Sequence, residues 1–214
     1  MIKKFFHEKQ QGTSEEELLS EIYTYSKEKL SELHERKRHI EIKTLYVLQA
    51  SVIIVTLFTI LLKYCDKFTG IFVTISHVFI GIFYIVLTLS VIVLLFALND
   101  NISKLKFIKW KFRDIFEQMD NDYEIYKITT KTEENDDIKK GEYIETPYVI
   151  DLLNMSKKNK CNKTIYFKRL CKQYHLSIYS ADKINIVKNY CFVFGTKLFI
   201  VALIIIISLG ILIA

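Results

Sequence analysis

The sequence between Leu45 and Leu98 is LYVLQASVIIVTLFTILLKYCDKFTGIFVTISHVFIGIFYIVLTLSVIVLLFAL. It contains two apolar runs, Leu45–Leu62 and Ile71–Leu98, which are separated by the short polar segment Lys63–Gly70. Neither run contains Asp, Glu, Lys or Arg. A helix needs about 20 mostly apolar residues to cross a bilayer, and a helix that is apolar on every side has no face for water. The two runs therefore predict a transmembrane helical hairpin.

A third apolar run, Phe199–Ala214, follows much later in the sequence. The charged residues lie almost entirely outside the three runs, and the chain contains only 1 Pro and 6 Gly among 214 residues. This composition favours long helices over a turn-rich β structure. We therefore expect an all-α integral membrane protein with three transmembrane helices. The expected parts are a cytoplasmic N-terminal helix (1–44), the transmembrane hairpin (45–98), a mostly helical cytoplasmic segment (99–190) and the third transmembrane helix (191–214).

Basic residues flank the hairpin on one side of the membrane. Cytoplasmic loops carry an excess of Lys and Arg, so these residues set the orientation. The connecting segment offers only Lys63 and Lys67. We therefore expect a multi-pass protein of the inner (cytoplasmic) membrane with its N-terminus in the cytoplasm. The flanking residues that carry this prediction are Arg36, Lys37, Arg38, Lys43, Lys104, Lys106, Lys109, Lys111 and Arg113.

The N-terminal arm shows a heptad-like pattern that leads into the first span. Ser14 followed by Glu17 resembles a capping box, and neither Gly nor Pro interrupts Ser14–Leu62, so one continuous helix is expected there. Such a seam suits either self-association as a coiled coil or packing on the protein's own soluble segment. Its members alternate in steps of four and three: Leu19, Tyr23, Ser26, Leu30, Leu33, Lys37, Ile40, Thr44 and Val47.

The soluble segment begins with ISKLKFIKWKFRDIF, residues 102–116. We expect the second span to continue past Leu98 as a basic amphipathic helix, with Trp110 as an anchor in the headgroup layer and the lysines toward anionic lipid. Further on, TIYFKRLCKQYH (164–175) predicts a separate short helix, and Ser180 a cap before the third span. Thr146 and Pro147 have the chemistry of another helix start.

Polar residues recur along the apolar runs at helical spacing. They form one stripe on each span, because steps of three and four residues place side chains on the same face. Polar groups in a bilayer usually face protein or water. The stripes therefore predict either the lining of a pore between copies or close helix packing with interhelical hydrogen bonds. The residues are Gln49, Thr56 and Thr59 in the first run and Thr74, His77, Gly81, Tyr84 and Thr88 in the second.

No catalytic signature is present. The chain lacks the GxSxG, P-loop, HExxH and dinucleotide-binding patterns, so we expect no enzyme activity and no cofactor. Cys171 and His175 are four residues apart and Cys161 lies nearby, but these spacings match no standard zinc site, and no metal is expected. The basic residues beside the span are better explained by topology than by nucleic-acid binding.

The arm EKLSELHERKRHIEIK (28–43), the two spans and the tight loop together resemble the SLATT-type membrane effectors of bacterial conflict systems. The third apolar run departs from the two-helix plan of that family. The resemblance implies a cytoplasmic part that detects a nucleotide second messenger or a sensor protein, and spans that form a pore in the membrane of an infected cell.

The resulting hypothesis is an oligomeric effector that forms a pore or disrupts the inner membrane on a cytoplasmic signal, in antiviral (anti-phage) defence. Its expected partners are the lipid bilayer and further copies of itself. The alternatives are a membrane-anchored adaptor that recruits a cytoplasmic partner, and an accessory subunit of a transporter complex.

Overall fold

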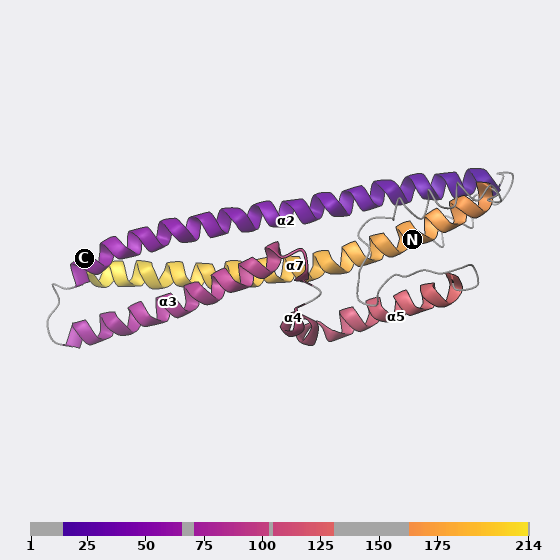
Figure 1. Ribbon diagram of the computed structural model, residues 1–214. Coiled ribbons are helices and arrows are strands. Elements are labelled where there is room, and N and C mark those ends of the chain that lie inside the picture. Colours follow the sequence, from indigo (N-terminus) through magenta and orange to yellow (C-terminus); the bar gives the residue numbers. More distant parts are fainter. Residues whose placement is uncertain (1–14, 66–70, 103–104, 131–162, 214) are drawn as a thin grey trace. The chain divides into compact units, whose positions relative to one another are not determined.

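The computed structural model describes residues 15–65, 71–102, 105–130 and 163–213, and every regular element in these ranges is a helix. The helices are α2 (Glu15–Cys65), α3 (Ile71–Leu98), α4 (Lys106–Lys111), α5 (Arg113–Thr130) and α7 (Lys163–Ile213) (Figure 1). They belong to two compact units. Unit 1 contains residues 1–35 and 111–183, and unit 2 contains residues 36–110 and 184–214.

Three helices are long and apolar enough to cross a membrane, and they are the three that the sequence predicts. The apolar windows lie within Glu17–Ile60 of α2, His77–Leu98 of α3 and Gln173–Ile211 of α7. The expectation of an all-helical chain with three candidate membrane spans is confirmed for the described residues. The long unbroken first helix is confirmed as well, because α2 continues from the polar arm into the first apolar run without interruption.

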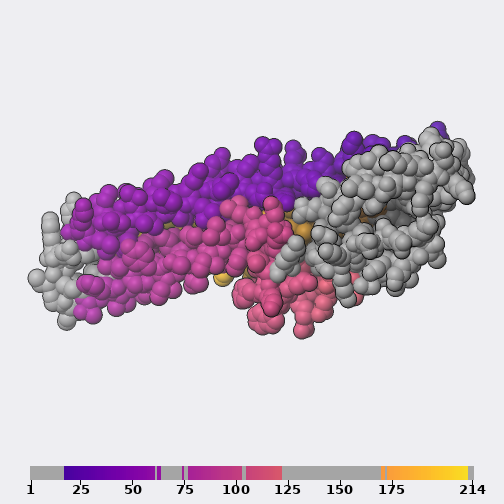
Figure 2. All heavy atoms as spheres, viewed as in Figure 1, coloured from indigo at the N-terminus to yellow at the C-terminus, as the bar shows by residue number. Residues whose placement is uncertain are grey.

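Unit 2 is a bundle of the second part of α2, the whole of α3 and the second part of α7. The aromatic rings of Phe58 and Phe83 are fully buried, and their centroids are 4.2 Å apart. Phe199 and Ala202 of α7 complete this core from the third side. On the face drawn in Figure 2, atoms of α3 lie directly against atoms of α2. The bundle interior is thus filled by side chains.

The third helix contacts α3 closely at Gly195. The buried Ser90 hydroxyl of α3 donates a hydrogen bond of 2.8 Å to the Gly195 carbonyl oxygen. A Cβ atom on Gly195 would lie 2.7 Å from the Leu94 Cγ atom. Glycine is therefore required here for close approach of two helices, as is common between transmembrane helices.

Unit 1 pairs the first part of α2 with the first part of α7. The rings of Tyr23 and Tyr174 meet edge to face with centroids 5.4 Å apart, and Leu30 and Leu33 pack in one cluster with Ala181. Residue numbers rise together along both helices, so α2 and α7 run parallel. The heptad-like seam of α2 thus packs on this chain's own soluble segment, which is one of its two expected uses.

Two expectations about helix ends are wrong. The second span does not continue past Leu98, because the sequence Asn-Asp-Asn at 99–101 forms a turn in which the Asn99 amide donates to the Phe96 carbonyl and the Asn101 amide to the Asn99 side chain. Asn and Asp favour such turns because their side chains replace backbone partners. Basic helix structure resumes only at α4.

The separate helix at 164–175 and the cap at Ser180 are also absent, because α7 runs unbroken through both. Ser180 is buried at 8% exposure, so it packs against the unit rather than ending a helix. No Pro lies between 163 and 213, and tertiary packing stabilises the helix through its polar half. The expected helix start at Thr146 and Pro147 lies outside the described residues.

We predict that Gly195→Ala lowers the free energy of unfolding of the detergent-solubilised protein by about 1–3 kcal/mol, because the added methyl group overpacks against Leu94. Gly210→Ala is the matched control, since a Cβ at Gly210 meets nothing within 4 Å. It is expected to leave stability unchanged or to raise it by up to about 1 kcal/mol. Thermal unfolding followed by circular dichroism measures both, and equal effects of the two variants would contradict the packing assignment.

Candidate functional site

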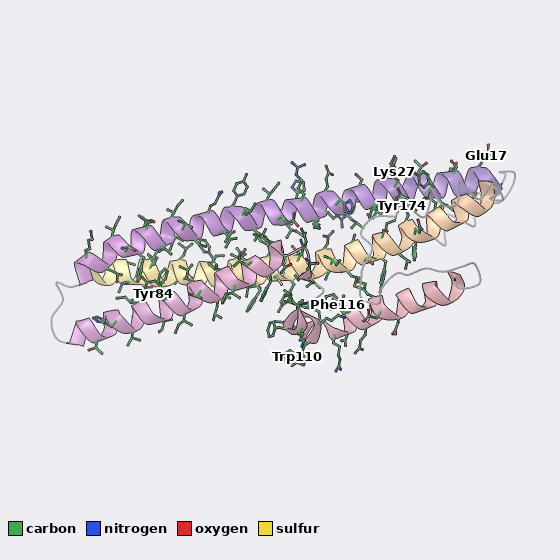
Figure 3. All side chains as sticks on the ribbon, viewed as in Figure 1. Glu17, Lys27, Tyr84, Trp110, Phe116 and Tyr174 are labelled. Atoms are coloured by element: carbon green, nitrogen blue, oxygen red, sulfur yellow. The ribbon has the colours of Figure 1, made fainter. Side chains whose placement is uncertain are left out.

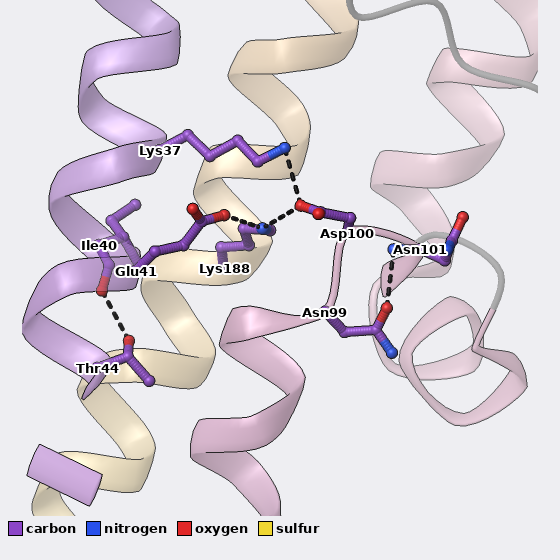
Figure 4. A network of polar contacts seen from close by, with 8 residues as sticks. All are labelled: Lys37, Ile40, Glu41, Thr44, Asn99, Asp100, Asn101 and Lys188. Atoms are coloured by element: carbon purple, nitrogen blue, oxygen red, sulfur yellow. Dashed lines mark hydrogen bonds and ion pairs between the residues drawn. The ribbon is translucent and has the colours of Figure 1, made fainter. Parts of the chain in front are cut away.

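Four charged side chains of unit 2 form a continuous network (Figure 4). The Lys188 ammonium group of α7 donates to a Glu41 carboxylate oxygen at 2.6 Å and to Asp100 Oδ1 at 3.3 Å. Lys37 Nζ lies 3.0 Å from the same Asp100 oxygen. The Lys188 side chain is completely buried, whereas Asp100 is 72% exposed. The network therefore extends from the bundle interior to the surface.

The local sequence explains how each group reaches the network. Lys37 and Glu41 are four residues apart on α2, so they share one helical face. Asp100 lies in the turn that ends α3, where it reaches beyond the end of the helix. Lys188 occupies the buried face of α7, between the buried residues Ile184 and Cys191.

The electrostatics of the network are balanced, with two positive and two negative groups. A buried ammonium group loses its hydration, so it must be paired and hydrogen-bonded to remain charged. Glu41 and Asp100 supply that pairing for Lys188. The hydrogen bond from Lys37, together with the positive charges of both lysines, holds the pKa of Asp100 below its usual value, and this outweighs partial burial.

The network lies where the apolar runs end. Glu41 precedes the first residue of the first run, Leu45, by four positions, and Asp100 follows the last residue of the second, Leu98, by two. One ion-pair network thus joins α2, α7 and the turn after α3, the three helices that are long and apolar enough to cross a membrane. The ion pairs hold these helices in position relative to one another.

The stripes of polar residues lie on the outer surface of the bundle. All eight predicted residues are exposed: Gln49, Thr56 and Thr59 on α2 and Thr74, His77, Gly81, Tyr84 and Thr88 on α3. The buried polar residues that α2 and α3 contribute to unit 2 are instead small hydroxyl residues, Thr44, Ser51 and Ser90. Apart from Tyr84, whose ring contacts Phe58, the stripe residues therefore lie away from the core of the chain.

Individual stripe residues differ in how their polar atoms are satisfied. The Thr56 and Thr59 hydroxyls donate to carbonyl oxygens one turn earlier, at 3.1 and 2.8 Å. The Tyr84 ring contacts the Phe58 ring edge to face at 5.4 Å. A Cβ at Gly81 would meet nothing within 4 Å, so its small size is not used inside the chain.

The predicted membrane-surface residues fall into two groups. Most are exposed, which agrees with the predicted role at a membrane surface: Arg36, Arg38, Lys43, Lys106, Trp110, Lys111 and Arg113. Lys37 and Lys109 are partly buried, and Lys37 belongs to the ion-pair network instead. Arg113 lies 3.4 Å from Glu117 within α5. Lys104 lies outside the described residues.

Sequence reasoning missed Glu41, Asp100 and Lys188 as a site. The one indication in the sequence was Lys37, a charged residue on the apolar seam of α2. Burial of that charge is unfavourable in free energy unless an acidic group from another part of the chain pairs with it.

The described residues contain no group of three or more metal-ligating side chains. Cys171 donates to the Leu19 carbonyl oxygen at 3.6 Å, and burial raises the pKa of its thiol. A thiol with a raised pKa is a poor metal ligand, since the thiolate is the binding form. Cys161 lies outside the described residues, and His175 is exposed.

No known protein family, curated protein or solved structure matches this chain.

We predict that Glu41→Gln destabilises the protein by about 3 kcal/mol, because Lys188 is then left buried with only a shared partner. The double variant Glu41→Gln with Lys188→Met should regain much of that loss, since no buried unpaired charge remains. Glu35→Gln, an exposed glutamate on the same helix, is the control. Thermal unfolding in detergent gives the values, and a Glu41→Gln effect as small as that of Glu35→Gln would refute the role of the network.

Proposed function

We propose that this chain is an oligomeric effector of the inner membrane that opens the bilayer when its cytoplasmic segment receives a signal. The observation that carries the proposal is the outward position of all eight polar stripe residues. We further propose that the N-terminus lies in the cytoplasm, because Lys and Arg gather before the first span and after the second.

A permeation path through a single copy is incompatible with the packing. Phe58, Phe83 and Leu94 are each fully buried between the spanning helices, so the interior leaves no room for water. Any aqueous path must therefore lie between copies, and the residues that line it must lie on the outer surface of the bundle.

Several stripe residues carry polar groups that are available for hydrogen bonds to other molecules. Within the described residues, the side-chain polar groups of Gln49, Tyr84 and Thr88 make no hydrogen bond. Thr88 is ten residues from Leu98, about 15 Å, which places it near the centre of a 30 Å hydrocarbon core. An unsatisfied amide or hydroxyl in hydrocarbon costs several kcal/mol, so contact with a second copy or with water is strongly favoured.

Gly81 adds a site of close approach. It lies on the same outer stripe of α3 as Tyr84 and Thr88, with open space over its Cα atom. Small residues on a transmembrane surface let two helices approach closely and bring neighbouring hydroxyls within hydrogen-bonding distance. Self-association through this face is thus supported by shape as well as by polarity.

The biological setting rests on the resemblance to SLATT-type effectors. It supplies the anti-phage role and the activating partner, a nucleotide second messenger or a sensor protein. Unit 1 is the candidate receiver of that signal. The helices α2 and α7 each contribute residues to both units. We propose that a change in how these two helices pair in unit 1 alters their packing in unit 2.

We predict that expression of the chain in bacteria collapses the membrane potential and that Gly81→Leu or Thr88→Leu abolishes the collapse. Both substitutions fill the outer stripe and remove nothing from the bundle core, so thermal stability should stay within about 0.5 kcal/mol of wild type. A potential-sensitive dye reports the collapse.

Gly210→Leu is the matched control and should depolarise cells as the wild type does, because Gly210 also has open space but lies outside the stripes. Unchanged potential at high expression of the wild type would contradict the proposal. A monomer held in a stable complex with a second protein, seen by crosslinking, would favour the adaptor alternative.

A further inference from the structure

The short helix α4 (Lys106–Lys111, KFIKWK) presents two aromatic side chains to the surface. Phe107 is 60% exposed and Trp110 is 75% exposed, and the latter is the highest value among the exposed large hydrophobic residues described. Their ring centroids are 6.4 Å apart. Trp110 is labelled on α4 in Figure 3. Exposure of large aromatic rings to water is unfavourable in free energy, so contact of this pair with an apolar surface is expected.

The opposite face of the same helix is anchored. Ile108 lies between the two aromatic residues in sequence and is 2% exposed, and Ile102 in the preceding turn is fully buried. The buried side thus packs α4 against the protein, and this packing exposes the rings of Phe107 and Trp110 on the opposite side.

Basic residues surround the aromatic pair. Lys106 and Lys111 are exposed at the two ends of α4, and Arg113 follows at the start of α5. Between 105 and 113 the sequence contains no acidic residue. A surface that combines exposed aromatic rings with exposed lysines is complementary to a membrane surface, where apolar chains lie directly beneath anionic phosphates.

The position of α4 in the chain indicates that a lipid bilayer covers the aromatic pair. Seven residues separate Leu98, the end of a candidate span, from Lys106. Even fully extended, that connection reaches only about 27 Å, so α4 is confined to the vicinity of the bilayer that α3 crosses. Tryptophan is enriched at this interface, where its ring is apolar and its N–H group remains hydrated.

We propose that α4 is a binding site for anionic phospholipid, in which Phe107 and Trp110 insert at the headgroup boundary and Lys106 and Lys111 contact lipid phosphates. This site is distinct from the polar stripes and does not depend on pore formation. It gives the protein a means of responding to the charge of the membrane in which it lies.

Trp110 allows a direct test, because it is the only tryptophan in the chain. The full-length protein is reconstituted into vesicles of phosphatidylcholine, with and without phosphatidylglycerol, and its fluorescence is recorded with lipids brominated near the headgroup. The expected result is a blue-shifted emission that brominated lipid quenches, and more strongly when phosphatidylglycerol is present. The variant Lys106→Gln with Lys111→Gln should lose the effect of phosphatidylglycerol, whereas Lys27→Gln should retain it.

Three results would overturn the assignment. Emission that acrylamide quenches and brominated lipid does not would place Trp110 in water. Protection from both quenchers would mean that protein covers the helix. Equal quenching by brominated lipid with and without phosphatidylglycerol would show that the site has no preference for anionic lipid.

Discussion

A buried ammonium group at the end of the membrane spans constrains the rest of this structure. Lys188 has no exposed side-chain surface, so α7 can occupy its position only if carboxylates from other helices meet it there. Glu41 and Asp100 do so from α2 and from the turn after α3. The close contact at Gly195 and the Ser90 hydrogen bond already restrict the position of α7 along α3, and the charged pairing adds a second contact that is satisfied in one register. Together they help to set which residues of the three helices lie level.

The parts of the fold that depend on local information could be predicted from the sequence. The apolar runs define the spans, and the absence of Gly and Pro defines the length of α2. The helix end at Leu98 and the continuity of α7 through 164–180 were not predicted, because the first depends on a turn stabilised by Asn99 and the second on the burial of residues such as Ser180. The ion-pair network was equally inaccessible, since Glu41, Asp100 and Lys188 are far apart in the chain.

The polar stripes show what residue spacing can predict and what only the packed structure can reveal. Spacing correctly groups Gly81, Tyr84 and Thr88 on one face, but only the packed bundle reveals that this face is external. The core is filled by Phe58, Phe83 and their neighbours, which leaves the polar atoms for contacts with other molecules. The proposed association between copies rests on this outward position of the stripes.

The central proposal is that α2 and α7 cross the membrane in the same direction and that α3, which lies between them in sequence, crosses in the opposite direction. The most direct test places a topology reporter in the full-length chain, inserted after Thr130 in one version and fused to Ala214 in another. The account predicts that the first reporter stays in the cytoplasm and that the second is exported. Reporters found on the same side of the membrane would contradict it.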